Sequence, residues 1–430
     1  MKLQKWYALR GPKYVAQRAF TLLDRYGITP SKAADRLMGS VSMLAEHGCA
    51  PTFPTPARVV QRYPQFIRHL QNAGAEIAVH GYDHVDLRGY SVAEACEQLL
   101  RAAQVFDRHG IERYGFRCPY LGCTDDVLDS LPVGVFEYSS NKAIEWDVIS
   151  STDGGDRPPT ASDVLHRLYK PMSALDAVGT PRSQSGIVEI PACLPDDLEL
   201  HDALGLGPEG MTEAWRQILQ RTHQRGELFV LMFHPELAVG CWQPFTTVLR
   251  EAALMRPTVW IARLRDISSW WRQKADFSVD ISPTPAGLQL TFTCTQRATI
   301  LVRGLLASSS DEEWDGTYRQ LRSRSLYVPA EPRPFVGLPS DTPQRVVSFL
   351  REQGYILDTG ETATCCGTYI DAATMTRLTS EVEIINHIEA LPGPLVRYWR
   401  WPAGAKSALC VTGDLDALTL LDYASRLFVR

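Results

Sequence analysis

Short apolar runs alternate with amphipathic stretches over the first 275 residues of the chain. The apolar runs predict buried strands over residues 76–79, 114–117, 187–190, 229–233 and 259–262. Apolar residues at helical spacing predict helices over 13–30, 31–48, 57–73, 91–106 and 211–225, and another that ends near 271. Alternating strands and helices are typical of a parallel α/β sheet or barrel, where functional groups gather at the C-terminal ends of the strands.

Polar and turn-forming residues predict where some of these helices begin and end. Ser31 is the expected N-cap of the helix over 31–48. Ser91 precedes the helix over 91–106, and Glu94 completes a capping box three residues later. A loop is expected between the second and third helices because of three closely spaced prolines, Pro51, Pro54 and Pro56.

The pattern changes around residue 277. Alternating apolar positions over 277–281 and 288–293 predict a small antiparallel element. Further helices are expected near 343–353 and 371–390. A chain of 430 residues has room for two or three domains, so we place a domain boundary near residue 275.

The composition excludes several classes of protein. Hydrophobic residues make up 45% of the chain and charged residues 22%, which is ordinary for a globular protein with a substantial core. The 44 Lys and Arg residues against 49 Asp and Glu residues give a net charge of −5. We therefore expect neither a nucleic-acid partner nor an anionic membrane surface. No apolar stretch approaches the ~20 residues that span a bilayer.

The first residues and the cysteines predict a reducing compartment. No apolar run follows the lysines of the opening segment 1–7, so a secretory signal peptide is not expected. The ten cysteines have irregular spacings, which are typical of reduced and mostly buried thiols. We therefore expect the protein in the cytoplasm.

Two histidines four positions apart follow the predicted strand over 76–79, in the sequence His80-Gly81-Tyr82-Asp83-His84. A short turn can bring both imidazoles to one metal ion. An HxxxH pattern also arises often by chance, so on its own it favours a metal site only weakly.

Three further predicted strands end in polar residues: Arg117 before Cys118-Pro119-Tyr120, His234 after 229–233, and Asp414 and Asp416 after the apolar segment 407–413. Each has a purely structural alternative. The arginine could lie on the surface before a turn, the histidine could be a hydrogen-bonded core residue, and the two acids could form a solvated turn.

Taken together, these segments resemble the signature of the polysaccharide deacetylase (NodB-homology, carbohydrate esterase family 4-like) family. That signature combines a strand ending in two acidic residues, an HxxxH pair, an R-x-P-[YF] segment and a late strand ending in histidine. The resemblance covers about residues 13–272 and 401–430. It implies a distorted (β/α) barrel that hydrolyses N-acetyl groups, usually on sugars, with a divalent metal.

The order of the segments departs from the family pattern. In the family the acidic strand comes first, whereas here it follows His80 by more than 300 residues. We therefore predict a circular permutation, in which a barrel over residues 1–275 is completed by a strand and helix in 401–430. A smaller α+β domain over 276–400 is then an insertion. Two alternatives are open: the C-terminal strand begins a degenerate second domain and leaves the barrel inactive, or it is donated between the protomers of a homo-oligomer.

The resemblance implies a metal centre. His80, His84 and Asp416 are its expected ligands, with positions left open for water and substrate. Zn²⁺ is the expected ion, and Co²⁺, Ni²⁺ or Mn²⁺ are alternatives.

The resemblance also implies catalytic roles for the other polar residues. Asp414 is the expected general base, paired with and oriented by Arg117, and an exchange of roles between Asp414 and Asp416 stays open. His234 is the expected general acid, because the pKa of histidine lies near neutrality.

Residues beyond the strand ends are candidates for the substrate cleft. Pro119 and Tyr120 could contact a sugar ring or close a turn. Glu189 and Asp197 could line the cleft or belong to a capped loop. We expect another group of residues to pack in the core rather than stack on sugars, namely Trp270, Trp271, Trp399 and Trp401.

These features predict a metal-dependent amide hydrolase that de-N-acetylates a sugar or glycoconjugate. One alternative is a related hydrolase of a non-sugar amide or of a cyclic imide or ureide. The other is an inactive barrel that binds carbohydrate.

Overall fold

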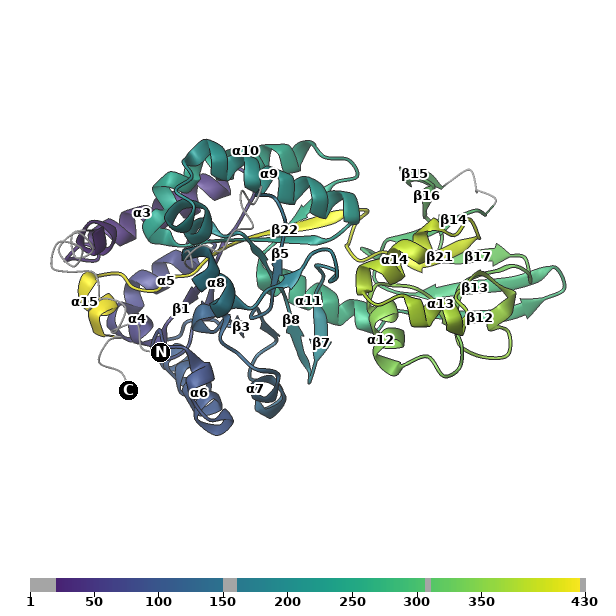
Figure 1. Ribbon diagram of the computed structural model, residues 1–430, viewed down its shortest axis with the longest axis horizontal. Helices are drawn as coiled ribbons and strands as arrows, with labels where there is room; N and C mark the ends of the chain where they lie inside the picture. The colour runs from purple at the N-terminus through teal and green to yellow at the C-terminus, as the bar shows by residue number, and fades with distance from the viewer. Residues whose placement is uncertain (1–20, 150–160, 306–310, 426–430) are drawn as a thin grey trace, which may run out of the picture.

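The chain folds into two lobes of unequal size (Figure 1). The computed structural model describes residues 21–149, 161–305 and 311–425. The chain leaves the larger lobe after helix α11 (Leu264–Ala275) and returns to it along strand β22 (Ser407–Gly413). The larger lobe is therefore built from segments that are far apart in the sequence.

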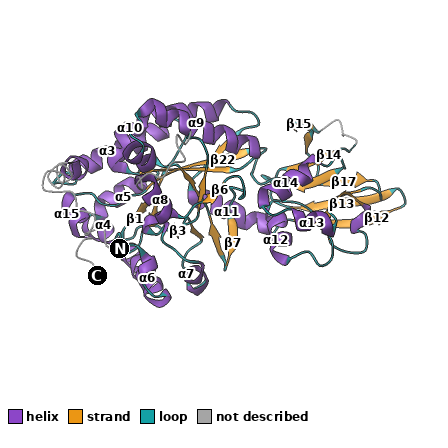
Figure 2. Ribbon diagram, in the orientation of Figure 1, coloured by secondary structure: helices purple, strands orange, loops and turns teal. Residues whose placement is uncertain are grey.

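The larger lobe is built on a curled, mostly parallel sheet with helices around its outside (Figure 2). Besides β22, its strands are β1 (Thr52–Thr55), β2 (Glu76–Val79), β3 (Gly115–Phe116), β4 (Tyr138–Ser139), β5 (Ala143–Glu145), β6 (Met172–Ser173), β7 (Arg182–Gln184), β8 (Ile187–Glu189), β9 (Ala192–Leu194), β10 (Leu228–Phe233) and β11 (Val259–Ile261). Their order is β6-β5-β9-β10-β22-β1-β2-β3-β4-β8-β7, and β11 also pairs with β22. This curled, mixed α/β half-barrel confirms the predicted fold class.

Strand β22 lies in the middle of this sheet. It runs parallel to β10 along its whole paired length, from Leu228 opposite Ala408 to Phe233 opposite Gly413. On its other side Thr412 pairs with Thr52 of β1. All seven residues of β22 are buried. The segment 407–413 is therefore a core strand of the larger lobe.

Helices occupy most of the predicted positions in the larger lobe. They are α3 (Ser31–Ala45), α4 (Ala57–Arg62), α5 (Pro64–Asn72), α6 (Val92–Arg108), α7 (Asp125–Ser130), α8 (Ala161–Tyr169), α9 (Pro208–Arg225), α10 (Ala238–Leu254), α11 and α15 (Leu420–Ser425). Short helical turns are η1 (Leu87–Gly89), η2 (Pro119–Leu121), η3 (Leu198–Ala203) and η4 (Pro235–Leu237). Of the helix expected over 13–30, residues 13–20 lie outside the described residues and 21–26 are helical. The predicted capping box of Ser91 and Glu94 is present at the start of α6.

Two predictions about helix ends are wrong. Pro30, not Ser31, is the N-cap of α3, because the fixed backbone of proline suits a helix start and Ser31 is already helical. The helix expected over 57–73 is divided into α4 and α5. Tyr63 between them has φ −130° and ψ 48°, since a residue before proline is disfavoured in the helical region.

The loop predicted from the three prolines contains strand β1, and that prediction is also wrong. All four residues of β1 are buried, and the strand pairs in register with β2 from Thr52 opposite Glu76. Pro54 has no N–H to donate, but its carbonyl oxygen accepts a hydrogen bond of 2.8 Å from the N–H of Leu415. A short strand with a central proline has no sequence pattern that distinguishes it from a loop.

Strands β4 and β5 are one strand interrupted by a bulge, which we call the 140–142 bulge. Ser139 pairs with Glu189, and the next paired residue, Ala143, lies opposite Ala192. Residues 140–142 therefore face only residues 190–191 on the partner strand. An extra residue of this kind bends a strand and re-aims its side chains.

The smaller lobe contains three small sheets, with strand orders β12-β13-β17, β15-β16-β14-β21 and β19-β18-β20. Their strands are β12 (Ser278–Thr284), β13 (Gly287–Thr293), β14 (Ile300–Arg303), β15 (Glu312–Asp315), β16 (Tyr318–Leu321), β17 (Ser325–Val328), β18 (Arg333–Gly337), β19 (Leu357–Asp358), β20 (Cys366–Tyr369) and β21 (Leu395–Tyr398). Its helices are α12 (Gln344–Glu352), the turn η5 (Ala363–Cys365), α13 (Ala372–Arg377) and α14 (Glu381–Ala390). The predicted antiparallel element is confirmed as the β12–β13 pair. The single helix expected over 371–390 is two helices, because Ser380 caps a new helix at Glu381.

Tryptophans fill the junction between the lobes. Trp270 and Trp401 are almost fully buried, and the rings of both contact the ring of Trp260. The indole N–H of Trp270 donates to the carbonyl of Arg400 over 2.7 Å. These side chains pack in the core, as expected.

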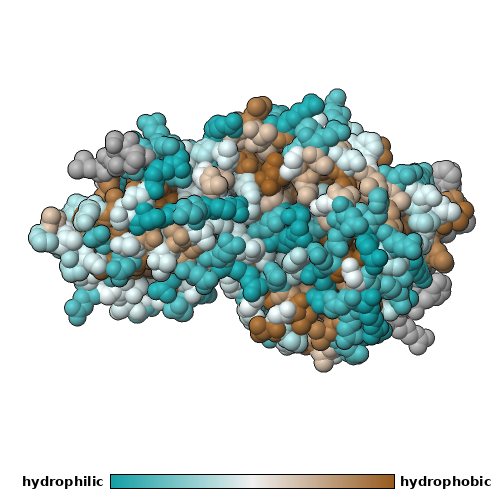
Figure 3. Space-filling view, turned by 180° about the vertical axis from the view of Figure 1, so that it is seen from behind, coloured by the Kyte–Doolittle hydropathy of each residue, from teal (hydrophilic) through white to brown (hydrophobic). Residues whose placement is uncertain are grey.

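Figure 3 shows hydrophilic residues over most of the visible face of both lobes, with hydrophobic residues in small groups. Among the described residues, no helix combines the length and apolarity needed to cross a membrane.

Candidate active site at the carboxyl ends of the strands

His80 follows the last residue of β2 and is buried. Its Nδ1 lies 2.7 Å from the carbonyl oxygen of Arg117. A carbonyl can only accept, so Nδ1 carries the proton and Nε2 is the unprotonated ring nitrogen. Nε2 is buried and has no hydrogen-bond partner among the described residues. His80 therefore presents a free lone pair toward its surroundings.

A tight turn brings His84 back beside His80. Gly81 has φ +73°, and a Cβ there would lie 3.1 Å from the carbonyl oxygen of Asp83, so the turn requires glycine. Asp83 also pairs with Arg58, with 2.9 Å between Oδ2 and Nη2. The centroids of the two imidazole rings are 5.1 Å apart. The turn thus fixes the geometry that the HxxxH spacing predicts.

Asp416, just beyond β22, reaches both histidines. Its Oδ1 lies 3.0 Å from Nε2 of His84 and 3.7 Å from Nε2 of His80. One ligand atom from each of these three residues lies within 4.8 Å of the others. Two imidazoles and a carboxylate suit Zn²⁺ and similar divalent ions, and the buried lone pair of His80 is the atom that such an ion would satisfy. The residues present therefore fit a divalent metal.

Asp414 points to a different partner from Asp416. Its Oδ1 accepts a hydrogen bond of 2.7 Å from Nη1 of Arg117, whose side chain is fully buried. The same Nη1 donates to Oγ1 of Thr412 over 2.9 Å. The other two nitrogens donate to Ser140, from Nη2 to Oγ over 2.9 Å and from Nε to the carbonyl over 3.1 Å. All three side-chain nitrogens of Arg117 thus donate hydrogen bonds, and one of them holds the carboxylate of Asp414 in place.

His234 follows β10 and pairs with Asp197. The two carboxylate oxygens of Asp197 accept from the backbone N–H and from Nδ1 of His234, each over 2.7 Å. Burial disfavours the imidazolium, but the charge of Asp197 and its hydrogen bond outweigh burial and hold the pKa of His234 well above its ordinary value. The contact with Asp197 therefore favours the protonated imidazole of His234.

Asp196 lies beside this pair and is fully buried. Its oxygens accept from the N–H of Glu199 over 2.8 Å and from the hydroxyl of Tyr169 over 3.1 Å. Burial, opposed by the charge of His234 and reinforced by that of Asp197, raises the pKa of Asp196 to about 7. Asp196, Asp197 and His234 also meet the distance criterion for a metal site. In this second cluster the carboxylate oxygens of both aspartates and Nδ1 of His234 are already hydrogen-bonded.

The structure brings most of the predicted site residues together. The N–H of Asp414 donates to the carbonyl of Phe233 over 2.9 Å, which joins the ends of β22 and β10 beside His234. The ring of Tyr120 lies edge-on to His84, with 4.9 Å between centroids, and its backbone has φ 58°. Pro119 lies against the turn at Gly81. Asp197 contacts His234 rather than standing free in a cleft.

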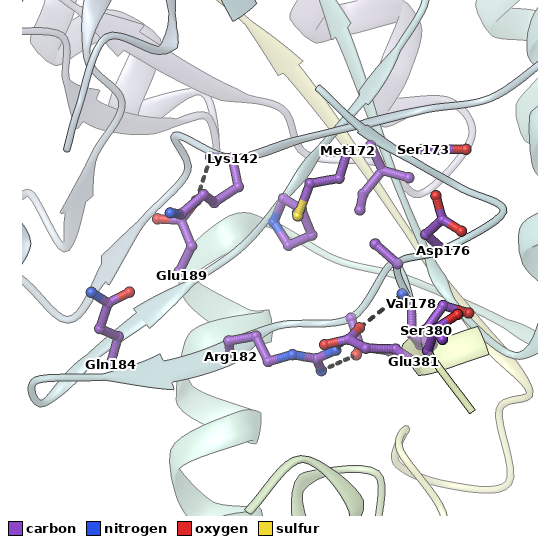
Figure 4. A pocket seen from close by; sticks show the side chains of 15 residues that line it. Lys142, Met172, Ser173, Asp176, Val178, Arg182, Gln184, Glu189, Ser380 and Glu381 are labelled. Atoms are coloured by element: carbon purple, nitrogen blue, oxygen red, sulfur yellow. Dashed lines mark hydrogen bonds and ion pairs between the residues drawn. The ribbon is translucent and has the colours of Figure 1, made fainter. Parts of the chain in front are cut away.

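Glu189 was predicted to line the substrate cleft, but its carboxylate is hydrogen-bonded to the 140–142 bulge and to Ser139. It accepts from the N–H groups of Asn141 and Lys142 and from the hydroxyl of Ser139. Glu189 also lines a cavity of about 610 Å³ between β6, β7 and the first turn of α14, in the seam between the lobes (Figure 4). In Figure 4 Glu189 and Lys142 lie on one side of this cavity, with Arg182 and Glu381 across it.

Sequence reasoning missed several partners of these residues. Thr412 lies near the end of β22 and precedes Asp414 by two positions, so alternation continued past the strand could have placed both on the same face. Ser140 and Tyr169 have no such signal, because their contacts depend on the bulge and on a helix packed across the site.

A comparison with protein families matches residues 33–132 to polysaccharide deacetylase. No curated protein matches the chain. Similar solved structures include the allantoinase PuuE, with 16% identity over 56% of this chain and 73% of that one, and a TM-score of 0.41. A peptidoglycan deacetylase, PdaC from Bacillus subtilis, has 13% identity over 58% of this chain and 89% of its own, with a TM-score of 0.31. A family 4 carbohydrate esterase from Streptomyces lividans has 14% identity over 52% and 84%, with a TM-score of 0.29.

Proposed function

We propose that this protein, whose residues 33–132 match the polysaccharide deacetylase family, is a metal-dependent amide hydrolase that de-N-acetylates a sugar or glycoconjugate. One observation carries the proposal. Asp414 and Asp416 meet the partners that the resemblance assigns to them, Arg117 and the two histidines, although more than 290 positions separate them in the sequence.

His80, His84 and Asp416 would hold the divalent ion, with Zn²⁺ as the first candidate. Such an ion lowers the pKa of water and polarises the amide carbonyl. The three side chains leave positions for water and substrate. The hydrogen bond from Nδ1 of His80 to the carbonyl of Arg117 keeps Nε2 deprotonated for this task.

Asp414 accepts the proton of the attacking water. Its pairing with Arg117 leaves the second carboxylate oxygen for that proton and fixes its direction. The division of labour between the two acids is supported by their contacts, since Asp416 lies against the histidines and Asp414 against Arg117. A base held in place in this way contributes about 10²–10⁴-fold to the rate.

His234 donates a proton to the leaving nitrogen. Asp197 keeps the proton on Nδ1 directed at itself and stabilises the imidazolium, so that Nε2 carries the proton that is transferred. The raised pKa of His234 keeps this acid charged at neutral pH. Pro119 and Tyr120 are proposed to contact the substrate next to His84.

We also propose that the catalytic unit is discontinuous, with residues 1–275 and 401–430 in one permuted barrel and 276–400 inserted. The position of β22 between β10 and β1 supports this division. It argues against an inactive barrel and against strand donation, because within one chain the two acids already lie beside His84 and Arg117.

The test is acetate release from N-acetylglucosamine oligosaccharides by protein reconstituted with Zn²⁺, Co²⁺, Ni²⁺ or Mn²⁺. The proposal predicts release that requires one of these ions and is lost with a chelator. Release that persists after complete removal of metal would contradict the metal centre. Absence of release from every N-acetylated sugar, by protein that binds metal, would contradict the substrate class.

A further inference from the structure

The carboxylate of Glu189 is the hydrogen-bonding centre of the 140–142 bulge. Its Oε1 accepts from the N–H of Asn141 over 2.7 Å and from the N–H of Lys142 over 2.6 Å, and Oε2 accepts from Ser139 Oγ. Residues of a bulge have no regular ladder partners for their N–H groups. Glu189 therefore replaces the partner strand at this point, and its own side chain is buried.

Ser140, inside this bulge, holds the arginine of the catalytic site. Its hydroxyl and its carbonyl accept two of the hydrogen bonds of Arg117. The third group of Arg117, Nη1, bonds Asp414. A continuous chain of short contacts thus runs from Glu189 through the backbone of the bulge to Arg117 and Asp414.

We propose that Glu189 is a positioning residue for catalysis, which sets the place of Ser140 and through it the orientation of Arg117 and Asp414. The proposal rests on the function proposed above. Glu189 touches no reacting atom in it, and its function is to make the bulge rigid. If the carboxylate is removed, the buried N–H of Asn141 and the partly buried N–H of Lys142 lose their acceptor, and the bulge must shift to find new partners.

The proposed role needs acceptor oxygens at fixed points and no negative charge. Glutamine keeps one oxygen for the two N–H groups, and its amide can donate to Ser139 Oγ. We therefore expect Glu189→Gln to work nearly as well as glutamate. Alanine provides no acceptor, and aspartate is too short to reach both N–H groups.

Glu76 provides a matched control. It is also a buried glutamate of the same sheet, and it accepts hydrogen bonds from Thr52, Tyr138 and the N–H of Arg265. It lies at the first residue of β2, at the opposite end of the strand from His80. Loss of Glu76 should reduce stability without moving Arg117.

The experiment compares kcat and KM of Glu189→Ala, Glu189→Gln and Glu76→Ala, each corrected for its folded and metal-loaded fraction. We expect Glu189→Ala to lower kcat by about 10–100-fold, the range typical of outer partners of a site, with KM nearly unchanged. Glu189→Gln should recover most of kcat, and Glu76→Ala should leave it unchanged. Equal kcat for Glu189→Ala and Glu76→Ala would overturn the proposal, and so would a Gln variant as slow as the Ala variant.

Two further variants keep the test valid if Glu189→Ala does not fold. Glu189→Asp should show a smaller loss of kcat in the same direction, and its wild-type kcat would contradict the proposal. Ser140→Ala should lower kcat. In the double variant Ser140→Ala with Glu189→Asp, the loss of kcat should be smaller than the two single losses combined, because both substitutions act through the same contact. Full additivity would contradict the proposal. Failure of the proposed function gives a different result, because the wild-type protein itself would then release no acetate.

Discussion

Two clusters of histidine and carboxylate side chains lie at the same end of the sheet, and both have the spacing of a metal site. The first, which we call the His80 cluster, contains His80, His84 and Asp416. The second, the His234 cluster, contains Asp196, Asp197 and His234, all buried. Distance alone does not distinguish them.

Their hydrogen bonds do distinguish them. In the His234 cluster Asp197 uses both oxygens on His234, and each oxygen of Asp196 accepts from a separate donor. In the His80 cluster, Nε2 of His80 has no hydrogen-bond partner among the described residues. A buried polar atom with an unused lone pair is costly unless a further group binds it.

The comparison teaches that the same side chains can serve two kinds of chemistry. A cluster whose carboxylate oxygens are already hydrogen-bonded is suited to holding and transferring protons. A cluster with an unused lone pair on a buried nitrogen is suited to binding a cation. We therefore infer that the His80 cluster binds the metal and that the His234 cluster moves a proton. The following changes test this division.

The largest effect is expected from loss of a metal ligand. Asp416→Asn or His80→Ala should remove the bound metal and lower activity by more than about 10³-fold, because the ion supplies several kcal/mol of transition-state stabilisation. Metal content measured by elemental analysis checks this directly. Asp196→Asn is the matched control and should retain the metal. Metal lost from the Asp196 variant but kept by the Asp416 variant would reverse the assignment.

A smaller loss is expected when the base is removed. Asp414→Asn should lower kcat by about 10²–10⁴-fold and leave the metal in place, because Asp414 contacts Arg117 and not the histidines. Single-turnover acetate release and metal content should be measured on the same sample. Loss of metal in this variant would mean that Asp414 and Asp416 have the exchanged roles.

Asp197→Asn should change the pH dependence more than the maximal rate. His234 acts as an acid while it is protonated, so activity falls as the pH rises through its raised pKa. Without the charge of Asp197, burial is no longer outweighed and the pKa of His234 falls. The alkaline limb of kcat/KM should therefore move to lower pH, with kcat/KM at low pH less affected. An alkaline limb that does not move would contradict the role of His234.

The smallest effect is expected on stability. The pKa of Asp196 is about 7 in the folded chain, against an ordinary value of 3.8 for aspartate, so the folded chain binds more protons between these values and loses stability as the pH rises through them. Asp196→Asn has no carboxyl to ionise at this position and therefore removes this loss of stability. The gain in the free energy of unfolding should be larger at pH 8 than at pH 5 by on the order of 2 kcal/mol.

Urea unfolding at the two pH values measures this difference. The control is Asp202, where the hydrogen bond and charge of Arg25 outweigh burial and lower the pKa. Asp202→Asn should gain no stability at pH 8. A similar pH dependence in both variants would show that Asp196 does not carry the extra proton.

The sequence could group the proposed metal and acid–base residues because each lies at or just beyond the end of a strand. His80, His234 and Asp414 all follow runs of apolar residues that are buried in the structure. The edge at which parallel strands end collects such residues, so a linear pattern was enough to group them. From the reversed order of the motifs we predicted that the segment 407–413 belongs to the same sheet, and in the structure this segment pairs with β10.

Other features had no linear signal. Strand β1 contains a proline in a short segment, so propensity indicated a loop. The 140–142 bulge depends on a register shift between two strands almost fifty residues apart. The contact between Asp197 and His234 joins two segments that only the packed structure brings together. These contacts are tertiary, and sequence periodicity carries no information about them.

The central position of β22 also has a consequence for the order of folding. Thr412 pairs with Thr52, which lies 360 positions earlier, and both neighbours of β22 precede it in the chain. Until residues 407–413 are in place, the edges of β1 and β10 that face them lack their partner. Contacts of such long sequence separation form slowly, and open strand edges promote association between chains. The chain is therefore expected to be most prone to aggregation just before the strand that leads to Asp414 and Asp416 joins the sheet.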